Sequence, residues 1–247
     1  MRLTAVCIST KEEHWKLEIP FSCLSEPGPS WGRVKDPKRI DYLADKQNRA
    51  LEKAMNEFPE TTHIIWTDSY YLDQTNAIQR LVVDYGTMSA IHGETILGGA
   101  ILCHDRTRIR YKVNYYDTWS TPEMDGKHFQ SDLSDLHNGP EQVSSVGGVY
   151  IFPRTVWENH HYQRPEPFPE SGCQHNYLCR ESRLPILLDW NSLFWRNVSY
   201  SVLKRLRCSI GDYRRRMSQA SKSEMLISFL EVTRHRGLNY PPLERRS

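Results

Sequence analysis

The chain has 247 residues, of which 38% are hydrophobic and 25% are charged, and its formal net charge is +2. This composition is typical of a soluble globular protein, and the chain contains no run of about 20 apolar residues that would span a bilayer. The apolar run in the opening "MRLTAVCIST" is too short for a signal peptide, so we expect a cytoplasmic protein.

The first half of the chain alternates between strand and helix patterns. Apolar residues near a helical period predict helices over 38–58 and 73–91. Residues 11–37 are punctuated by Pro, Gly and Ser, and we expect a long loop there. Short apolar segments predict strands, which are 2–10, 62–67, 95–105 and 108–119.

The second half contains more polar connections. Residues 120–142 predict a loop, and the Pro-rich 163–170 predicts a connector. Strands are expected over 143–153 and 184–190. Helices are predicted over 154–162, over 171–182 with Ser171 as its opening residue, and twice within 201–236.

This order of elements predicts an α/β fold, with a mostly parallel central sheet flanked by helices on both faces. We expect residues 1–200 to form that domain and residues 201–247 to form a basic helical extension. The extension contains eleven Lys/Arg against four Asp/Glu, whereas residues 1–200 contain 21 against 26. Such an asymmetry favours attraction to an anionic membrane surface, an anionic glycan or nucleic acid, and we expect peripheral contact with an anionic membrane. A solvated helical face explains the asymmetry equally well.

Asp68 follows the apolar segment "HIIWT", which reads as a buried strand. In an open α/β sheet the carboxyl ends of the strands form the ligand crevice. A carboxylate there can meet a metal ion, a sugar or a phosphate-bound ion, or it can cap the next helix. Asp73 lies five residues further along the chain. It can supply a second carboxylate beside Asp68, or it can cap the helix that starts near Gln74.

Four segments in this order resemble a GT-A glycosyltransferase domain of the nucleotide-sugar-dependent, family-two-like type, with a fainter likeness to fungal-type mannosyltransferases. The resemblance covers about residues 3–197 and implies a GT-A-like, Rossmann-like fold. It rests on "ADKQNRALEKA", "HIIWTDSYY", "SSVGGVYIFPRTVWE" and "FPESGCQHNYLCRESRLPILLDWNSLFW".

On the donor side, the resemblance implies that Asp68 takes the first position of a DxD motif, whose carboxylates hold Mn²⁺ or Mg²⁺ against the diphosphate. The third position is Tyr70 rather than a second Asp, which departs from the family pattern. Lys46 and Asn48 match positions near the nucleotide, and a solvated helix face is the alternative. At the end of the first strand, Ser9 and Thr10 match positions that contact the base, although short hydroxyls are also ordinary turn formers.

On the acceptor side, the resemblance implies that Glu170, at the start of a helix, deprotonates the acceptor hydroxyl. Charge compensation at a helix N-terminus is the competing explanation. His175 lies one turn further and can assist. The glycines Gly147 and Gly148 suggest close approach of a sugar or acceptor to a strand, or a bulge. Trp119 can stack on a sugar face or anchor the core.

The sequence therefore predicts a glycosyltransferase that moves a sugar from a nucleotide-sugar donor to a glycan, lipid-linked or protein acceptor. The rival hypothesis is a GT-A-fold protein that binds a nucleotide or glycan without catalysis, because the second acid is absent. We expect no nucleic-acid partner, since the sequence contains neither an aromatic and basic strand pattern nor a zinc module.

Overall fold

The computed structural model describes residues 1–10, 19–31, 35–105, 112–115 and 139–196. The chain divides into two compact units, Met1–Cys103 with Val113–Asn197, and His104–Lys112 with Val198–Ser247. The second unit lies almost wholly outside the described residues, and so do the helices predicted after residue 200.

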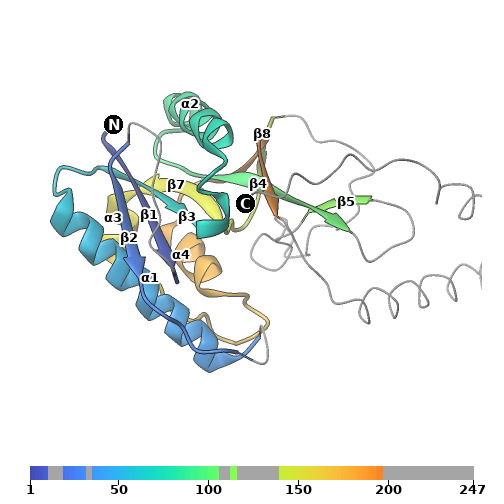
Figure 1. Ribbon diagram of the computed structural model, residues 1–247. Coiled ribbons are helices and arrows are strands. Elements are labelled where there is room, and N and C mark those ends of the chain that lie inside the picture. Colours follow the sequence, from blue (N-terminus) through green and yellow to red (C-terminus); the bar gives the residue numbers. More distant parts are fainter. Residues whose placement is uncertain (11–18, 32–34, 106–111, 116–138, 197–247) are drawn as a thin grey trace, which may run out of the picture. The chain divides into compact units, whose positions relative to one another are not determined.

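The fold is α/β and is built on one mixed sheet (Figure 1). Within the described residues the strand order is β2-β1-β3-β7-β4-β8-β6, with β5 paired to β4 outside this path. Strands β2, β1, β3, β4 and β8 run in one direction, and β7 and β6 run in the other. The strands are β1 (Leu3–Ser9), β2 (Phe21–Ser25), β3 (His63–Thr67), β4 (Ile96–Asp105), β5 (Lys112–Tyr115), β6 (Pro140–Gln142), β7 (Val149–Pro153) and β8 (Ile186–Arg196).

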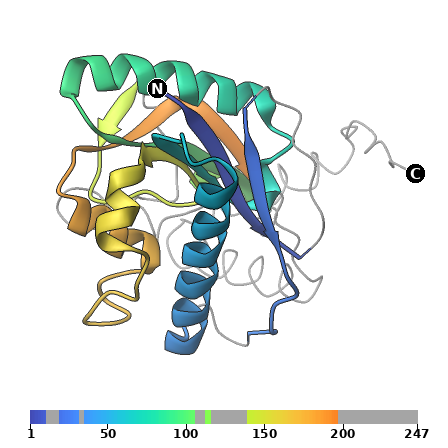
Figure 2. The ribbon, with the colours of Figure 1, turned by 90° about the vertical axis from the view of Figure 1, so that its left-hand side faces the viewer.

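Helices cover both faces of this sheet, as the sequence predicted (Figure 2). The buried side chains of α1, α3 and α4 join one core cluster, whereas those of α2 join the other. Successive strand residues alternate between the two clusters, for example Ile64 and Ile65 in β3, because neighbouring side chains point to opposite faces. The helices are α1 (Pro37–Glu57), α2 (Thr75–His92), α3 (Arg154–His160) and α4 (Gln174–Ser182).

Two of the predicted loops contain strands. The expected loop 11–37 includes β2, which pairs in parallel with β1 through Phe21–Ser25. The expected loop 120–142 includes β6, which pairs with β8. Both strands are short, and β6 is mostly exposed, so neither shows the apolar alternation that marks a strand in a sequence.

Two predicted boundaries are also wrong. The strand expected over 143–153 begins only at Val149, so Gly147 and Gly148 precede it. The strand expected over 184–190 continues to Arg196 as β8, past a shift of register between Gly99 and Ala100 of its partner.

Candidate functional site

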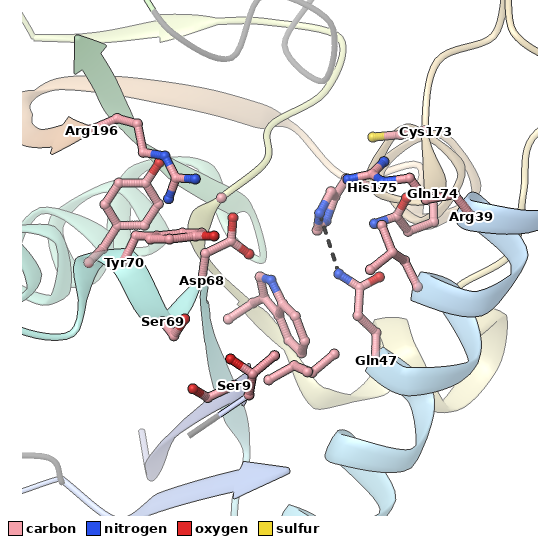
Figure 3. Close-up of a pocket in the computed structure, with 16 residues that line it drawn as sticks. Ser9, Arg39, Gln47, Asp68, Ser69, Tyr70, Cys173, Gln174, His175 and Arg196 are labelled. Carbon is pink, nitrogen blue, oxygen red and sulfur yellow. Dashed lines mark hydrogen bonds between the residues drawn. The ribbon is translucent and has the colours of Figure 1, made fainter. Parts of the chain in front are cut away.

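A cleft of about 430 Å³ lies at the carboxyl ends of β1 and β3. Its walls come from these two strand ends, the short 3₁₀ turn η1 (Ser69–Tyr71), helices α1 and α4, and the end of β8 (Figure 3). The polar and charged side chains that line it are Ser9, Thr10, Arg39, Gln47, Asp68, Ser69, Gln174, His175 and Arg196.

Asp68 reaches the cleft because β3 is an interior strand that ends immediately before it. Strand β3 pairs with β1 on one side and β7 on the other. The Asp68 backbone N–H donates to the Gly148 carbonyl at 2.9 Å, and its own carbonyl accepts from the Tyr71 N–H at 3.0 Å. These bonds turn the chain into η1 and leave the half-buried Asp68 side chain at the strand end. The predicted placement of this strand end at a cleft is confirmed.

Gly148 also lines the cleft, and its need for glycine has a local cause. Its φ is +70°, and an added Cβ would lie 2.3 Å from Cδ1 of Ile101. A side chain there would therefore meet backbone strain and a collision in the core at once. Gly147 is buried but does not line the cleft.

Helix α1 faces the cleft with Arg39, Leu43 and Gln47, which recur every four residues and so share one face. The two residues predicted from this helix lie elsewhere. Lys46 is 5% exposed and forms an ion pair with Glu26. Neither it nor Asn48 belongs to the cleft lining.

Asn48 instead ties α1 to the segment around α3. Its amide nitrogen donates to the Tyr162 carbonyl at 3.0 Å. Its amide oxygen accepts from the Tyr162 N–H at 2.8 Å and from Nε1 of Trp157 at 3.1 Å. Both ends of the amide are thus engaged in holding the fold together.

His175 forms part of a buried polar network behind the cleft. Its Nε2 lies 3.4 Å from Nε2 of Gln47, and its Nδ1 lies 2.8 Å from the Tyr150 hydroxyl, which contacts the hydroxyl of Tyr162. Burial lowers the pKa of His175 to about 3 and raises that of both tyrosines. The imidazole is therefore neutral near pH 7, with one ring nitrogen donating and the other accepting.

Arg196 closes the opposite side of the cleft. Its guanidinium carbon lies 3.1 Å from the centroid of the Tyr70 ring, and Tyr70 is 63% exposed (Figure 3). The backbone N–H of the preceding residue, Trp195, donates to Oε1 of Gln74 at 2.7 Å. The backbone carbonyl of Trp195 accepts from Nε2 of the same Gln74 amide at 2.9 Å. These two hydrogen bonds hold the end of β8 beside the turn that precedes α2.

The structure does not bring every predicted site residue to the cleft. Glu170 is exposed on a turn and does not line it. The helix expected to open at Ser171 begins at Gln174, because Cys173 is its N-cap and Asn176 accepts from the Cys173 N–H at 2.7 Å. Trp119 lies outside the described residues.

Residue 73 is an exposed aspartate that takes neither of its predicted roles. It does not line the cleft, and the N-cap of α2 is Gln74, without a side-chain capping bond. Sequence reasoning also missed several lining residues, four of which have long polar or charged side chains. Regular spacing along α1 could have revealed two of them, since they lie on one helical stripe. The four are Arg39, Gln47, Gln174 and Arg196.

The residues of the cleft fit Mn²⁺ or Mg²⁺ poorly. Hard cations are held by several oxygen ligands, usually with carboxylates among them. Within the described lining, Asp68 carries the single carboxylate, and two guanidinium groups share the same cleft. The described part of the chain contains no group of three or more His, Cys, Asp or Glu side chains arranged to hold a metal.

No described helix combines the length and the apolar character that crossing a bilayer requires. The chain matches no protein-family model, and a search of curated proteins finds no match for it.

Proposed function

We propose that the chain is a glycosyltransferase that binds a nucleotide-sugar donor in the cleft between α1, η1 and α4. One observation carries the proposal. Asp68 from the end of β3 lines the same cleft as Ser9 and Thr10 from the end of β1, the parallel strand beside it. Ligands of open α/β sheets bind at this edge.

The charges of the cleft suit such a donor. Transfer of the sugar releases a nucleoside phosphate, and negative charge develops on the leaving oxygen. Arg39 and Arg196 line the cleft and supply positive charge to stabilise that oxygen. Tyr70 lines the cleft and is largely exposed, so it can contact a sugar or a base.

Transfer also needs a group that accepts the proton of the attacking hydroxyl. Within the described lining, only Asp68 has a carboxylate, whereas Glu170 is exposed outside the cleft. We therefore assign this role to Asp68. The predicted assignment of Glu170 as the base rested on a helix start that the structure places at Gln174.

A second function, binding of a nucleotide sugar without catalysis, is favoured by the same observation. A cleft with a single described carboxylate can bind a donor and yet lack one of the acids that transfer needs. The two functions differ in one measurable product, the nucleoside phosphate that only transfer or hydrolysis releases.

The test combines binding with turnover. Thermal shift with UDP-, GDP-, dTDP- and CMP-sugars identifies the donor, because a ligand that binds only the folded state raises the melting temperature. Release of nucleoside phosphate is then measured for the wild type and for Asp68→Asn. We expect Asp68→Asn to lower release by about 10²–10⁴-fold while the free nucleotide still binds.

The matched control is Asp73→Asn, which removes the same charge five residues away and outside the cleft. We expect it to behave as the wild type does. Donor binding without release by the wild type favours the non-catalytic function. Absence of binding to every donor refutes both functions.

A further inference from the structure

We propose that Cys7 and Cys23 form a reversible disulfide between β1 and β2, so that the pair is a site of thiol oxidation. The inference does not depend on the proposed function. The two residues are direct partners in the parallel pairing of these strands. The structure contains both as thiols, and their sulfur atoms lie 3.1 Å apart.

The strand pairing already meets the geometric requirement of a disulfide (Figure 1). Neighbouring strands lie about 4.7–4.9 Å apart, and the Cα atoms of a disulfide are usually about 4.4–6.8 Å apart. Partners in register on parallel strands point their side chains to the same face of the sheet. The sulfurs of Cys7 and Cys23 therefore need to approach each other by only about 1 Å to reach the bond length of about 2.0 Å.

The two thiols differ in burial, and this difference sets the order of the reaction. Cys7 is 0% exposed. Cys23 is partly exposed, because β2 lies at one end of the strand order within the described residues. A small disulfide such as oxidised glutathione therefore reaches Cys23 first, and Cys7 is the neighbouring thiol that can resolve the adduct.

The chemistry is thiol–disulfide exchange in two steps. The Cys23 thiolate attacks one sulfur of oxidised glutathione, which forms a mixed disulfide and releases one glutathione thiolate. The Cys7 thiolate then attacks the Cys23 sulfur, which forms the bond between the two cysteines and releases the second glutathione thiolate. The protons of the two protein thiols end on the two released thiolates, so two protein thiols are oxidised as one glutathione disulfide is reduced. An excess of reduced glutathione reverses both steps.

The pair lies beside the cleft along both strands. Ser9, two residues after Cys7, lines the cleft, and its carbonyl accepts from the backbone N–H of Glu26 at 3.0 Å. Glu26, three residues after Cys23, also forms the ion pair with Lys46 of α1. A disulfide would therefore add a covalent link to a corner of the sheet that hydrogen bonds and an ion pair already hold together.

The experiment incubates the full chain with defined ratios of reduced to oxidised glutathione, blocks the remaining thiols with N-ethylmaleimide before unfolding, and maps tryptic peptides without reduction. Trypsin cleaves after Lys and Arg, so Cys7 falls in peptide 3–11 and Cys23 in peptide 17–33. We expect the two peptides to be joined after oxidising mixtures, and to be separate and alkylated after reducing mixtures or dithiothreitol. The oxidised chain should also melt about 5–10 °C higher, because a cross-link between residues 16 apart in sequence restricts the unfolded chain.

Three variants test the order of attack. Cys7→Ala should accumulate glutathione on Cys23, because the resolving thiol is gone. Cys23→Ser should leave Cys7 as a buried thiol without an adduct. Cys179→Ser is the matched control, since it removes a thiol that is 1% exposed and donates to the Val146 carbonyl. It should form the link between Cys7 and Cys23 as the wild type does, and circular dichroism monitors the folding of each variant.

Three results would overturn the inference. Persistence of both thiols in fully oxidised glutathione would show a packed thiol pair only. A stable glutathione adduct on Cys23 of the wild type, or a bond from either residue to a different cysteine, would show that the two do not react with each other. A melting temperature that falls on oxidation would show that the bond distorts the strand pairing. None of these results bears on the proposed function, whose test is the binding of nucleotide sugars.

Discussion

The buried His175 should make the protein unusually sensitive to mild acid. Its pKa is about 3 in the folded protein, because burial disfavours the imidazolium, whereas an exposed histidine titrates near pH 6.5. Below pH 6.5 the unfolded chain binds a proton at this residue that the folded chain does not. The stability that the neutral His175 contributes is therefore fully present above pH 6.5 and is lost as the pH falls toward 3.

The shift in pKa sets the size of this effect. The two pKa values imply that protonation of His175 lowers the free energy of unfolding by about 2 kcal/mol at pH 5 and by about 3 kcal/mol at pH 4. For a chain of this size, 2 kcal/mol corresponds to a fall in melting temperature of about 4–8 °C.

The assay compares urea unfolding of the wild type and of His175→Asn between pH 7.5 and pH 4.5. The variant should be less stable at pH 7.5, because it loses buried contacts, but its stability should fall less steeply with acid. Other titrating groups contribute to both proteins, so the difference between the two slopes isolates His175. His92→Asn, on the exposed last turn of α2, controls for a general effect of removing a histidine. Parallel pH profiles for the wild type and His175→Asn would refute the reasoning.

Three further substitutions test the assignments above. Asn48→Ala should lower the free energy of unfolding in urea by about 1–3 kcal/mol, because three hydrogen bonds between α1 and the α3 segment are lost, and it should leave nucleotide affinity unchanged. The control, Asn56→Ala at an exposed position of the same helix, should change the free energy of unfolding by less than about 0.5 kcal/mol. Gly148→Ala should lower the free energy of unfolding by about 1–3 kcal/mol, because φ is positive there and the new Cβ would collide with Ile101. Gly86→Ala, in α2 where the added Cβ meets open space, should raise the free energy of unfolding by up to about 1 kcal/mol. Glu170→Gln should retain the full rate of nucleoside phosphate release; a loss of 10²-fold or more would restore Glu170 as the base.

Much of the framework follows from sequence patterns because it depends on long periodic segments. Helix α1 was predicted over 38–58 and spans Pro37–Glu57, with Asp36 accepting from the Lys38 N–H as its cap. Strand β3 was predicted over 62–67 and spans His63–Thr67. Apolar side chains at the right period must be buried wherever the element packs, so these patterns survive in the fold.

The predicted site is only partly recovered, for a reason of helix geometry. Successive residues of a helix point about 100° apart, so Lys46 and Asn48 lie on either side of Gln47, the residue that lines the cleft. Lys46 and Asn48 were predicted because the resemblance to a glycosyltransferase helix places the matching positions near the nucleotide. The spacing of Arg39, Leu43 and Gln47 marks one stripe of α1 in the sequence, but packing against the sheet decides that this stripe meets the cleft.

The position of Arg196 depends on a feature that no sequence pattern showed. Strand β8 pairs in register with β4 up to Asp189 opposite Gly99, and then resumes with Leu193 opposite Ala100. Three residues are therefore inserted at the irregularity, and an odd insertion reverses the face to which later side chains point. Phe194 consequently packs in the α2 core, edge-on against Tyr71 of η1, and Arg196, two residues on, points to the same face and meets Tyr70. Without the insertion, that strand end would present the opposite set of side chains to η1, so the irregularity is what gives the cleft its second arginine.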